Sequence, residues 1–176
     1  MVTSVAHTYF LAGAFPAAIE SYAGRSGYYM DAAAWAALGE TGRCIELLRE
    51  RLAGRALSPL MSGLMASLLA LLEGSPADAV SIMERTSVQR EPEAMVYFAR
   101  HYARAGSTDA AVTMIRGAAD RGFRCAPETL CGHEWMQPLL ATTAGQRLLD
   151  DTKAWRDQAL AADGKIDDQN SRRNAS

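Results

Sequence analysis

The sequence predicts an all-α fold built from antiparallel helix hairpins. Three observations support this prediction. Apolar residues recur with helical spacing, glycine and proline fall at intervals rather than in clusters, and no alternating run rich in valine and isoleucine indicates a sheet. Hydrophobic residues make up 49% of the 176 residues, which is ample for a core. We therefore expect one domain or one short repeat array, in which abundant alanine lets helices approach closely.

The clearest hairpin spans residues 92–123. Pro92 suits the first position of a helix, and Ser107 suits the N-cap of a second helix after the break at Gly106. The apolar stripes of the two helices contain Met95, Phe98, Ala99 and Tyr102, and then Ala111, Ile115 and Ala118. Helices joined by so short a turn lie antiparallel. One hairpin has too little core to stand alone, so we expect it to stack on others.

A glycine followed five residues later by a small residue recurs four times along the chain. The pairs are Gly13 with Ala18, Gly39 with Cys44, Gly74 with Ala79, and Gly106 with Ala111. Seven residues before each glycine is another small residue: Ala6, Ala32, Ser67 and Ala99. We expect each glycine to take the positive φ that ends a first helix. The small residues should then mark the closest approach of the two helices in each hairpin.

This pattern resembles the tetratricopeptide repeat, a helix–turn–helix unit of about 34 residues. The fourth unit carries the motif through Met95, Phe98, Ala99, Tyr102, Gly106, Ala111 and Ile115, and the second through Tyr28, Ala32, Trp35, Gly39 and Leu48. The second unit departs from the family at Asp31, where leucine is usual, and at Cys44, where alanine is usual. The resemblance covers about residues 2–123. It implies a right-handed superhelix of four degenerate hairpins within residues 1–123.

Residues 124–163 are expected to close the array. This part is similar to the segment that follows such repeats in bacterial signalling proteins, among them winged-helix regulators, class III adenylate cyclases and receptor-like Ser/Thr kinases. The matching residues are Gly122-Phe123, Trp135-Met136 and Pro138-Leu139, whereas His133-Glu134 and Leu140 depart from the usual Asp-Pro and arginine. We expect a capping helix from about Gln146 to Ala162. Residues 164–176 carry mixed charges and should be disordered.

Charge and cysteine content narrow the function classes. The formal net charge of −2 gives no general attraction to nucleic acid or to an anionic membrane. Three scattered cysteines argue against a disulfide framework. The most apolar run, Leu60 to Leu72, is too short to span a bilayer, and no signal peptide is evident. We expect a cytoplasmic protein without a direct nucleic-acid or membrane partner.

Cys125, Cys131 and His133 form the one group that suggests a metal. Thiolate and imidazole are zinc ligands, and Glu128 or Glu134 would have to supply the fourth. Their spacing fits no common metal signature, so we favour the alternative that both cysteines are small buried hydrophobic residues. No phosphate-binding loop, dinucleotide fingerprint or His-Glu-x-x-His motif occurs. We therefore expect no cofactor and no enzymatic activity.

A concave inner groove is the expected binding surface. First-helix residues outside the packing stripes should line it, and the candidates are His7, Tyr29, Leu64, Leu68, Arg100 and Arg104. Arg100 and Arg104 lie one helical turn apart and could grip a carboxylate or an acidic segment, although a solvated face is an equal alternative. The leucines could bind another copy or a partner helix, or could pack inside a closed array. His101 should point away from the core into solvent.

The preferred hypothesis is a non-enzymatic scaffold or adaptor that binds a peptide or protein segment in this groove. The alternative is a ligand-sensing regulatory domain of a bacterial signalling or transcription-control system. A zinc protein or enzyme built on Cys125, Cys131 and His133 is a third possibility, and homo-oligomerisation stays open.

Overall fold

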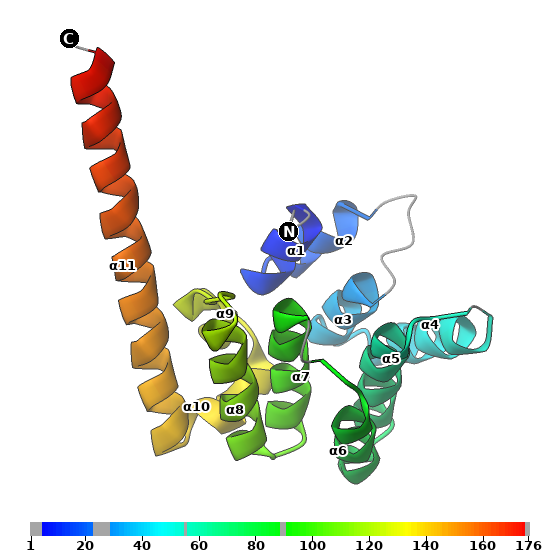
Figure 1. Cartoon of the computed structure of the whole chain (residues 1–176). Coiled ribbons are helices and arrows are strands. Elements are labelled where there is room, and N and C mark those ends of the chain that lie inside the picture. The colour runs from blue at the N-terminus through cyan, green and yellow to red at the C-terminus, as the bar shows by residue number, and fades with distance from the viewer. Residues whose placement is uncertain (1–4, 23–28, 55, 89–90, 175–176) are drawn as a thin grey trace.

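The computed structural model describes residues 5–22, 29–54, 56–88 and 91–174, with side chains described up to residue 161. All regular structure within these ranges is helical, which confirms the all-α prediction (Figure 1). The first eight helices are α1 (Val5–Leu11), α2 (Phe15–Glu20), α3 (Met30–Ala37), α4 (Thr41–Gly54), α5 (Pro59–Leu72), α6 (Pro76–Arg85), α7 (Pro92–Arg104) and α8 (Thr108–Asp120). The closing part contains α9 (Pro127–Cys131), the 3₁₀ helix η1 (Glu134–Met136), α10 (Gln137–Leu140) and α11 (Thr143–Asn174).

The first eight helices form four consecutive pairs: α1 with α2, α3 with α4, α5 with α6, and α7 with α8. The second helix of each of the first three pairs also packs against the first helix of the next pair. Five glycines, Gly13, Gly39, Gly74, Gly106 and Gly122, have φ between 77° and 88°. The four that precede the second helix of a pair are the four selected from the sequence.

The turns share one hydrogen-bonding pattern. The N–H groups of the residues after these glycines donate to carbonyl oxygens five residues earlier, and the pairs are Ala14 to Tyr9, Glu40 to Trp35, Ser75 to Ala70, Ser107 to Tyr102 and Phe123 to Ala118. This Schellman geometry satisfies carbonyls at the helix end and requires a left-handed residue, which glycine adopts at little cost. The prediction that each glycine ends a first helix is confirmed.

The small residues of the second helices are buried, as a close approach of paired helices requires. Ala18, Cys44, Ala79 and Ala111 are all 0% exposed. In the second pair, the Cys44 thiol donates to the Ala32 carbonyl oxygen at 3.1 Å. Burial raises the pKa of this thiol to about 12, so it stays neutral. Cysteine therefore serves in this position as a small buried residue with one satisfied donor.

Asp31, the other residue of the second unit that departs from the repeat pattern, also has a structural role. Its two carboxylate oxygens accept hydrogen bonds from Arg51 Nη1 and Nη2 at 2.6 and 2.7 Å. Both side chains are largely buried, and the pair joins α3 to α4. A two-point arginine–carboxylate contact fixes orientation as well as distance, and it takes the place of an apolar contact from leucine.

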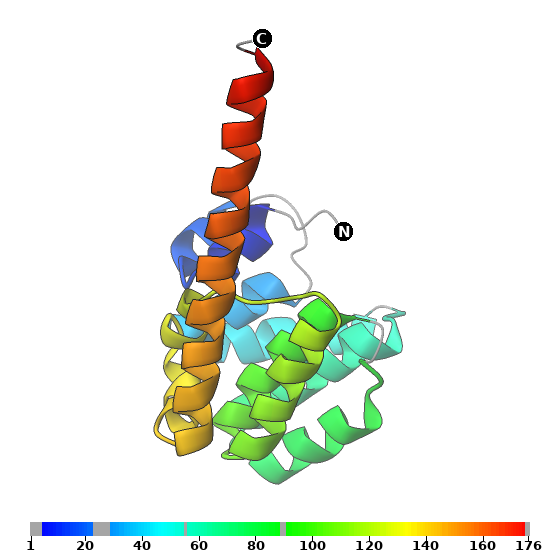
Figure 2. The same cartoon turned by 60° about the vertical axis from the view of Figure 1, so that its left-hand side comes forward.

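The closing part packs mainly against the fourth pair. η1 and α10 contact α7, whereas α11 contacts α8 and α9. Figures 1 and 2 show α11 continuing well beyond the body of the molecule. The helix continues to Asn174, whereas the sequence predicts a disordered tail from residue 164. An isolated glycine costs a helix only about 1 kcal/mol, and this stretch contains no proline. Residues 175 and 176 lie outside the described part.

The two ends of the helical array touch each other. A Cβ atom added to Gly13, in the first turn, would lie 2.7 Å from the carbonyl oxygen of Gly132, which follows α9. The Phe10 ring of α1 contacts Tyr97 of α7 and His133 of the closing part, with ring centroids 5.9 and 6.4 Å apart. The first pair therefore packs against the fourth pair and the closing part. Within the described residues, no helix has the length and apolar character needed to cross a membrane.

Replacement of Gly13 by alanine should destabilise the protein more than the same change at Gly39. Both residues have positive φ, but the added Cβ meets no atom within 4 Å at Gly39 and strikes backbone at Gly13. We expect Gly39→Ala to cost about 1–2 kcal/mol from the left-handed conformation alone. Gly13→Ala should cost more, because the backbone of residue 132 must move. Chemical denaturation of both variants measures the difference, and equal losses would contradict a tight contact at Gly13.

Candidate binding site

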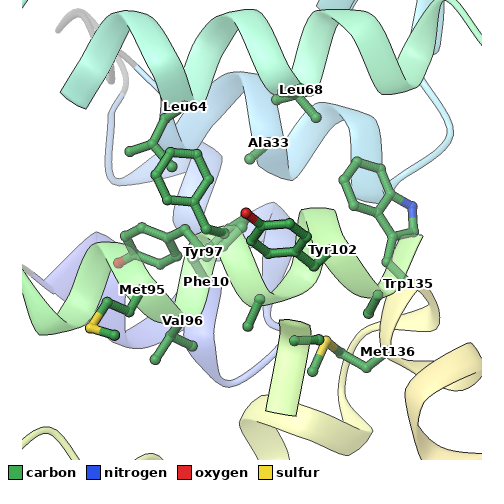
Figure 3. Close-up of a cluster of buried hydrophobic side chains, with 14 of the residues drawn as sticks. Phe10, Ala33, Leu64, Leu68, Met95, Val96, Tyr97, Tyr102, Trp135 and Met136 are labelled. Atoms are coloured by element: carbon green, nitrogen blue, oxygen red, sulfur yellow. The ribbon is translucent and has the colours of Figure 1, made fainter. Parts of the chain in front are cut away.

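The predicted groove is closed, because most of its residues are buried in the centre of the molecule. Tyr29, Leu64 and Leu68 are only 2%, 3% and 0% exposed. Figure 3 shows Leu64 and Leu68 on the side of α5 that faces α7, where the rings of Tyr97 and Tyr102 lie. The leucines therefore pack inside a closed array, which was one of the two alternatives for them. We refer to this buried region, formed by the facing sides of α1, α3, α5 and α7, as the central layer.

The two arginines of the predicted groove lie in different environments. Arg104 is exposed, and its guanidinium lies 5.4 Å from the centre of the Trp135 ring. Arg100 is 2% exposed, which corrects the expectation that it lies on an open surface. The two residues are one turn apart, but the closing part covers Arg100 and leaves Arg104 in solvent. They therefore do not form a joint surface clamp.

Arg100 is held by few contacts for a buried charge. Its Nη2 donates a long hydrogen bond of 3.4 Å to the Thr129 carbonyl oxygen, and its guanidinium lies 4.6 Å from the centre of the Phe10 ring. Nε and Nη1 are buried and have no hydrogen-bonding partner among the described residues. Burial lowers the pKa of Arg100, but arginine keeps its charge in proteins. The centre of the molecule thus contains an incompletely satisfied cation.

His101, which follows Arg100 in the sequence, is also buried. The expectation that it faces solvent is wrong. It is 0% exposed, with Nε2 2.7 Å from Tyr29 Oη and Nδ1 2.8 Å from Ser67 Oγ. Ser67 also donates to the Leu64 carbonyl oxygen. One assignment satisfies every group: the Tyr29 hydroxyl donates to Nε2, and Nδ1–H donates to the Ser67 oxygen. The ring is therefore a neutral link between α3, α5 and α7.

A second polar group lies where α1 meets α7. Glu93 Oε1 accepts hydrogen bonds from the Tyr97 hydroxyl and from His7 Nδ1, the latter at 2.6 Å. Burial tends to raise the pKa of the Glu93 carboxyl, but these two hydrogen bonds outweigh it and lower the pKa. His7, a predicted groove residue, is half-buried and joins the first pair to the fourth. It acts here as a contact between helices.

The three candidate metal ligands do not converge. His133 is buried and its Nδ1 accepts the Trp135 backbone N–H at 3.2 Å, so it caps η1. Cys125 is buried as expected, but Cys131 is exposed, so that part of the expectation is wrong. Among the residues that the structure describes, no group of three possible ligands could hold a metal ion.

Two surface hollows flank residues 124–126. One, of about 420 Å³, lies between this segment and α11 and is lined by Arg124, Cys125, Ala126, Trp155, Arg156, Gln158 and Ala159. The other, of about 290 Å³, lies between the segment and α1 and is lined by Thr8, Leu11, Ala12, Phe123, Arg124, Cys125, Ala126, Glu128 and Thr129. We call them the α11 hollow and the α1 hollow. Both have mostly apolar walls, and both carry charged residues at the edge.

The sequence did not predict that His101 and Ser67 are hydrogen-bonded in the buried centre, that Thr129 contacts Arg100, or that the two hollows exist. A signal for the buried centre was available, because α7 carries Tyr97 and His101 away from its expected apolar stripe. Rings on the supposedly solvated face indicate that this face is also covered. The hollows depend on where α1 and α11 meet residues 124–126, and no local pattern in the sequence specifies that meeting point.

Comparisons with models of known protein families, with curated proteins and with solved structures found no match to this chain.

Stability should fall as the pH is lowered from 6.5 towards 3. Burial and the nearby Arg100 charge lower the pKa of both His101 and His133 to about 3. In the unfolded chain each ring has its ordinary pKa near 6.5, so between these values the unfolded state binds more protons. The free energy of unfolding should decrease by about 1.4 kcal/mol per pH unit for each histidine.

Urea denaturation at a series of pH values measures this slope. His133→Asn supplies an uncharged side chain that can still cap η1, so this variant should show a shallower slope than the unmodified protein. A slope unchanged by the substitution would show that His133 does not carry a depressed pKa.

Proposed function

We propose that this chain is a non-enzymatic interaction module, a short tetratricopeptide-like superhelix that binds a segment of another protein. The α11 hollow is the observation that carries the proposal. The four helix pairs with their left-handed glycines support the architectural part. The binding surface in this proposal differs from the groove inferred from the sequence, because the central layer is filled by its own side chains.

The chemistry of the α11 hollow favours an amphipathic partner segment with acidic residues. Trp155 and Ala159 of α11 offer apolar surface, and Leu160, the next residue, is 63% exposed. Arg124 and Arg156 lie on the same rim. Arg156 contacts Glu128 and Asp157 at 3.4 Å only, and such exposed pairs contribute little to stability. A partner's apolar side chain could enter the hollow while its carboxylates meet the two arginines.

A photo-crosslinking amino acid at position 159 should capture a defined partner in the source cell, whereas the same group at position 154 should not. Ala159 lines the hollow, and Ala154 is an exposed alanine of the same helix outside it. Mass spectrometry identifies the captured protein. With the purified partner, Ala159→Arg should weaken binding at least tenfold, about 1.4 kcal/mol, because a long charged side chain fills the hollow.

Ala154→Arg is the matched control, with the same change of charge and helix propensity. Its affinity should equal that of the unmodified protein. Equal crosslinking at both positions, or equal loss of affinity in both arginine variants, would remove the α11 hollow from the proposal.

A ligand-sensing regulatory domain is the second candidate, and a separate observation favours it. Arg100 is a buried cation with two nitrogens that lack hydrogen-bonding partners within the described chain. A small anion bound near it would couple α1, α7 and the closing part, which all contribute to its surroundings. Such coupling is what a ligand-dependent change of conformation requires.

A further inference from the structure

Arg100 is a buried cation, and the groups around it in the described part of the chain carry no negative charge to balance it. The titratable groups whose negative forms would stabilise its charge are Tyr29, Tyr97 and Cys125, and the neutral rings of His101 and His133 also lie near it. Burial raises the pKa of the first three groups, that of Cys125 to about 11, so each is neutral near pH 7. Glu93, on the same helix, is engaged with His7 and Tyr97. Among the described residues, therefore, no carboxylate pairs with this guanidinium.

Burial of an unpaired charge lowers the free energy of unfolding, so such a residue calls for a functional explanation. Removal of one partner from a buried ion pair destabilises proteins strongly, whereas an apolar side chain of similar size is often tolerated. Leucine or methionine would fit the apolar contacts with Phe10 without leaving any donor unsatisfied. We therefore expect the unliganded chain to be less stable with arginine at this position than with leucine or methionine. A bound anion would remove that cost.

The α1 hollow lies beside the guanidinium. Thr129, whose carbonyl oxygen accepts the long bond from Arg100, lines this hollow, and so does Cys125. Phe10, under the guanidinium, is on α1 between the lining residues Thr8 and Leu11. Arg100 is not itself among the lining residues, and Thr129, which its Nη2 contacts, connects the guanidinium to the hollow. Its volume of about 290 Å³ and its apolar lining suit a short hydrocarbon chain.

We propose that the α1 hollow and Arg100 together bind a monocarboxylate with a short aliphatic tail. The carboxylate pairs with Nε and Nη1 of the guanidinium, the two nitrogens without a hydrogen-bonding partner among the described residues, while Nη2 keeps its bond to Thr129. The tail lies against Leu11, Ala12 and Phe123. This inference deepens the ligand-sensing candidate and is independent of partner binding in the α11 hollow.

Thermal unfolding with sodium hexanoate tests the proposal. A ligand that binds only the folded state raises its melting temperature as the concentration exceeds Kd. At saturating hexanoate we expect a rise of roughly 2–4 °C. Hexan-1-ol has the same tail without the charge, and sodium acetate has the charge without the tail. Neither should shift the transition at the same concentration and ionic strength, and calorimetric titration should give one site per chain.

Two variants test the two halves of the site. Arg100→Met keeps the length of the side chain and removes the charge, so it should melt at or above the unliganded protein and lose the response to hexanoate. Thr8→Trp fills the hollow from an exposed position and leaves Arg100 in place. It should also lose the response, whereas Tyr9→Trp, on the adjacent exposed position outside the hollow, should keep it.

If Arg100→Met does not fold, the comparison of Thr8→Trp with Tyr9→Trp decides the question. The proposal is overturned if hexanoate gives no shift, if hexan-1-ol gives an equal shift, or if Thr8→Trp responds as the unmodified protein does. Each of these results leaves crosslinking at position 159 unaffected, so failure of the anion site can be distinguished from failure of the interaction proposal.

Discussion

The enclosure of α7 is the constraint on which the rest of the structure depends. Ten consecutive residues of this helix, from Ala94 to Ala103, are buried. A helix covered on every side is normally apolar all round, but α7 carries Tyr97, Arg100 and His101 within this stretch. Tyr97 donates to Glu93 of the same helix, whereas Arg100 and His101 take their partners from elsewhere in the chain. The arrangement of α1, α3, α5 and the closing part supplies most of those partners.

The polar contacts around α7 also specify how the helices are arranged. Apolar packing tolerates small rotations of a helix, whereas a hydrogen bond to a ring nitrogen fails when the ring turns away. Tyr29 and Ser67 contact opposite nitrogens of His101. Both ring nitrogens are therefore hydrogen-bonded only when α3 and α5 are both in place. Loss of one partner would leave a buried donor or acceptor unpaired, which costs about 1–3 kcal/mol.

The four helix pairs could be predicted from the sequence because each is specified locally. A glycine with positive φ, a small residue five positions later and the helical spacing of apolar residues all lie within one hairpin. The closed centre could not be predicted in the same way. Periodicity identifies the residues that share a helix face, but the covering of that face depends on contacts such as Phe10 with Tyr97 and Gly13 with Gly132. These residues are far apart in the sequence, so no short sequence pattern can predict that they are in contact.

The contact between Gly13 and Gly132 affects how the chain folds. In an open solenoid each repeat touches only its neighbours, so terminal repeats can unfold while the middle persists. Here the first turn rests on the closing part, and detachment of either end exposes the rings around α7. Unfolding of α1 and α2 therefore removes the support of the fourth pair, and the array should behave as one cooperative unit. The same contact sets the number of hairpins, because the insertion or removal of one pair would pull these two glycines apart.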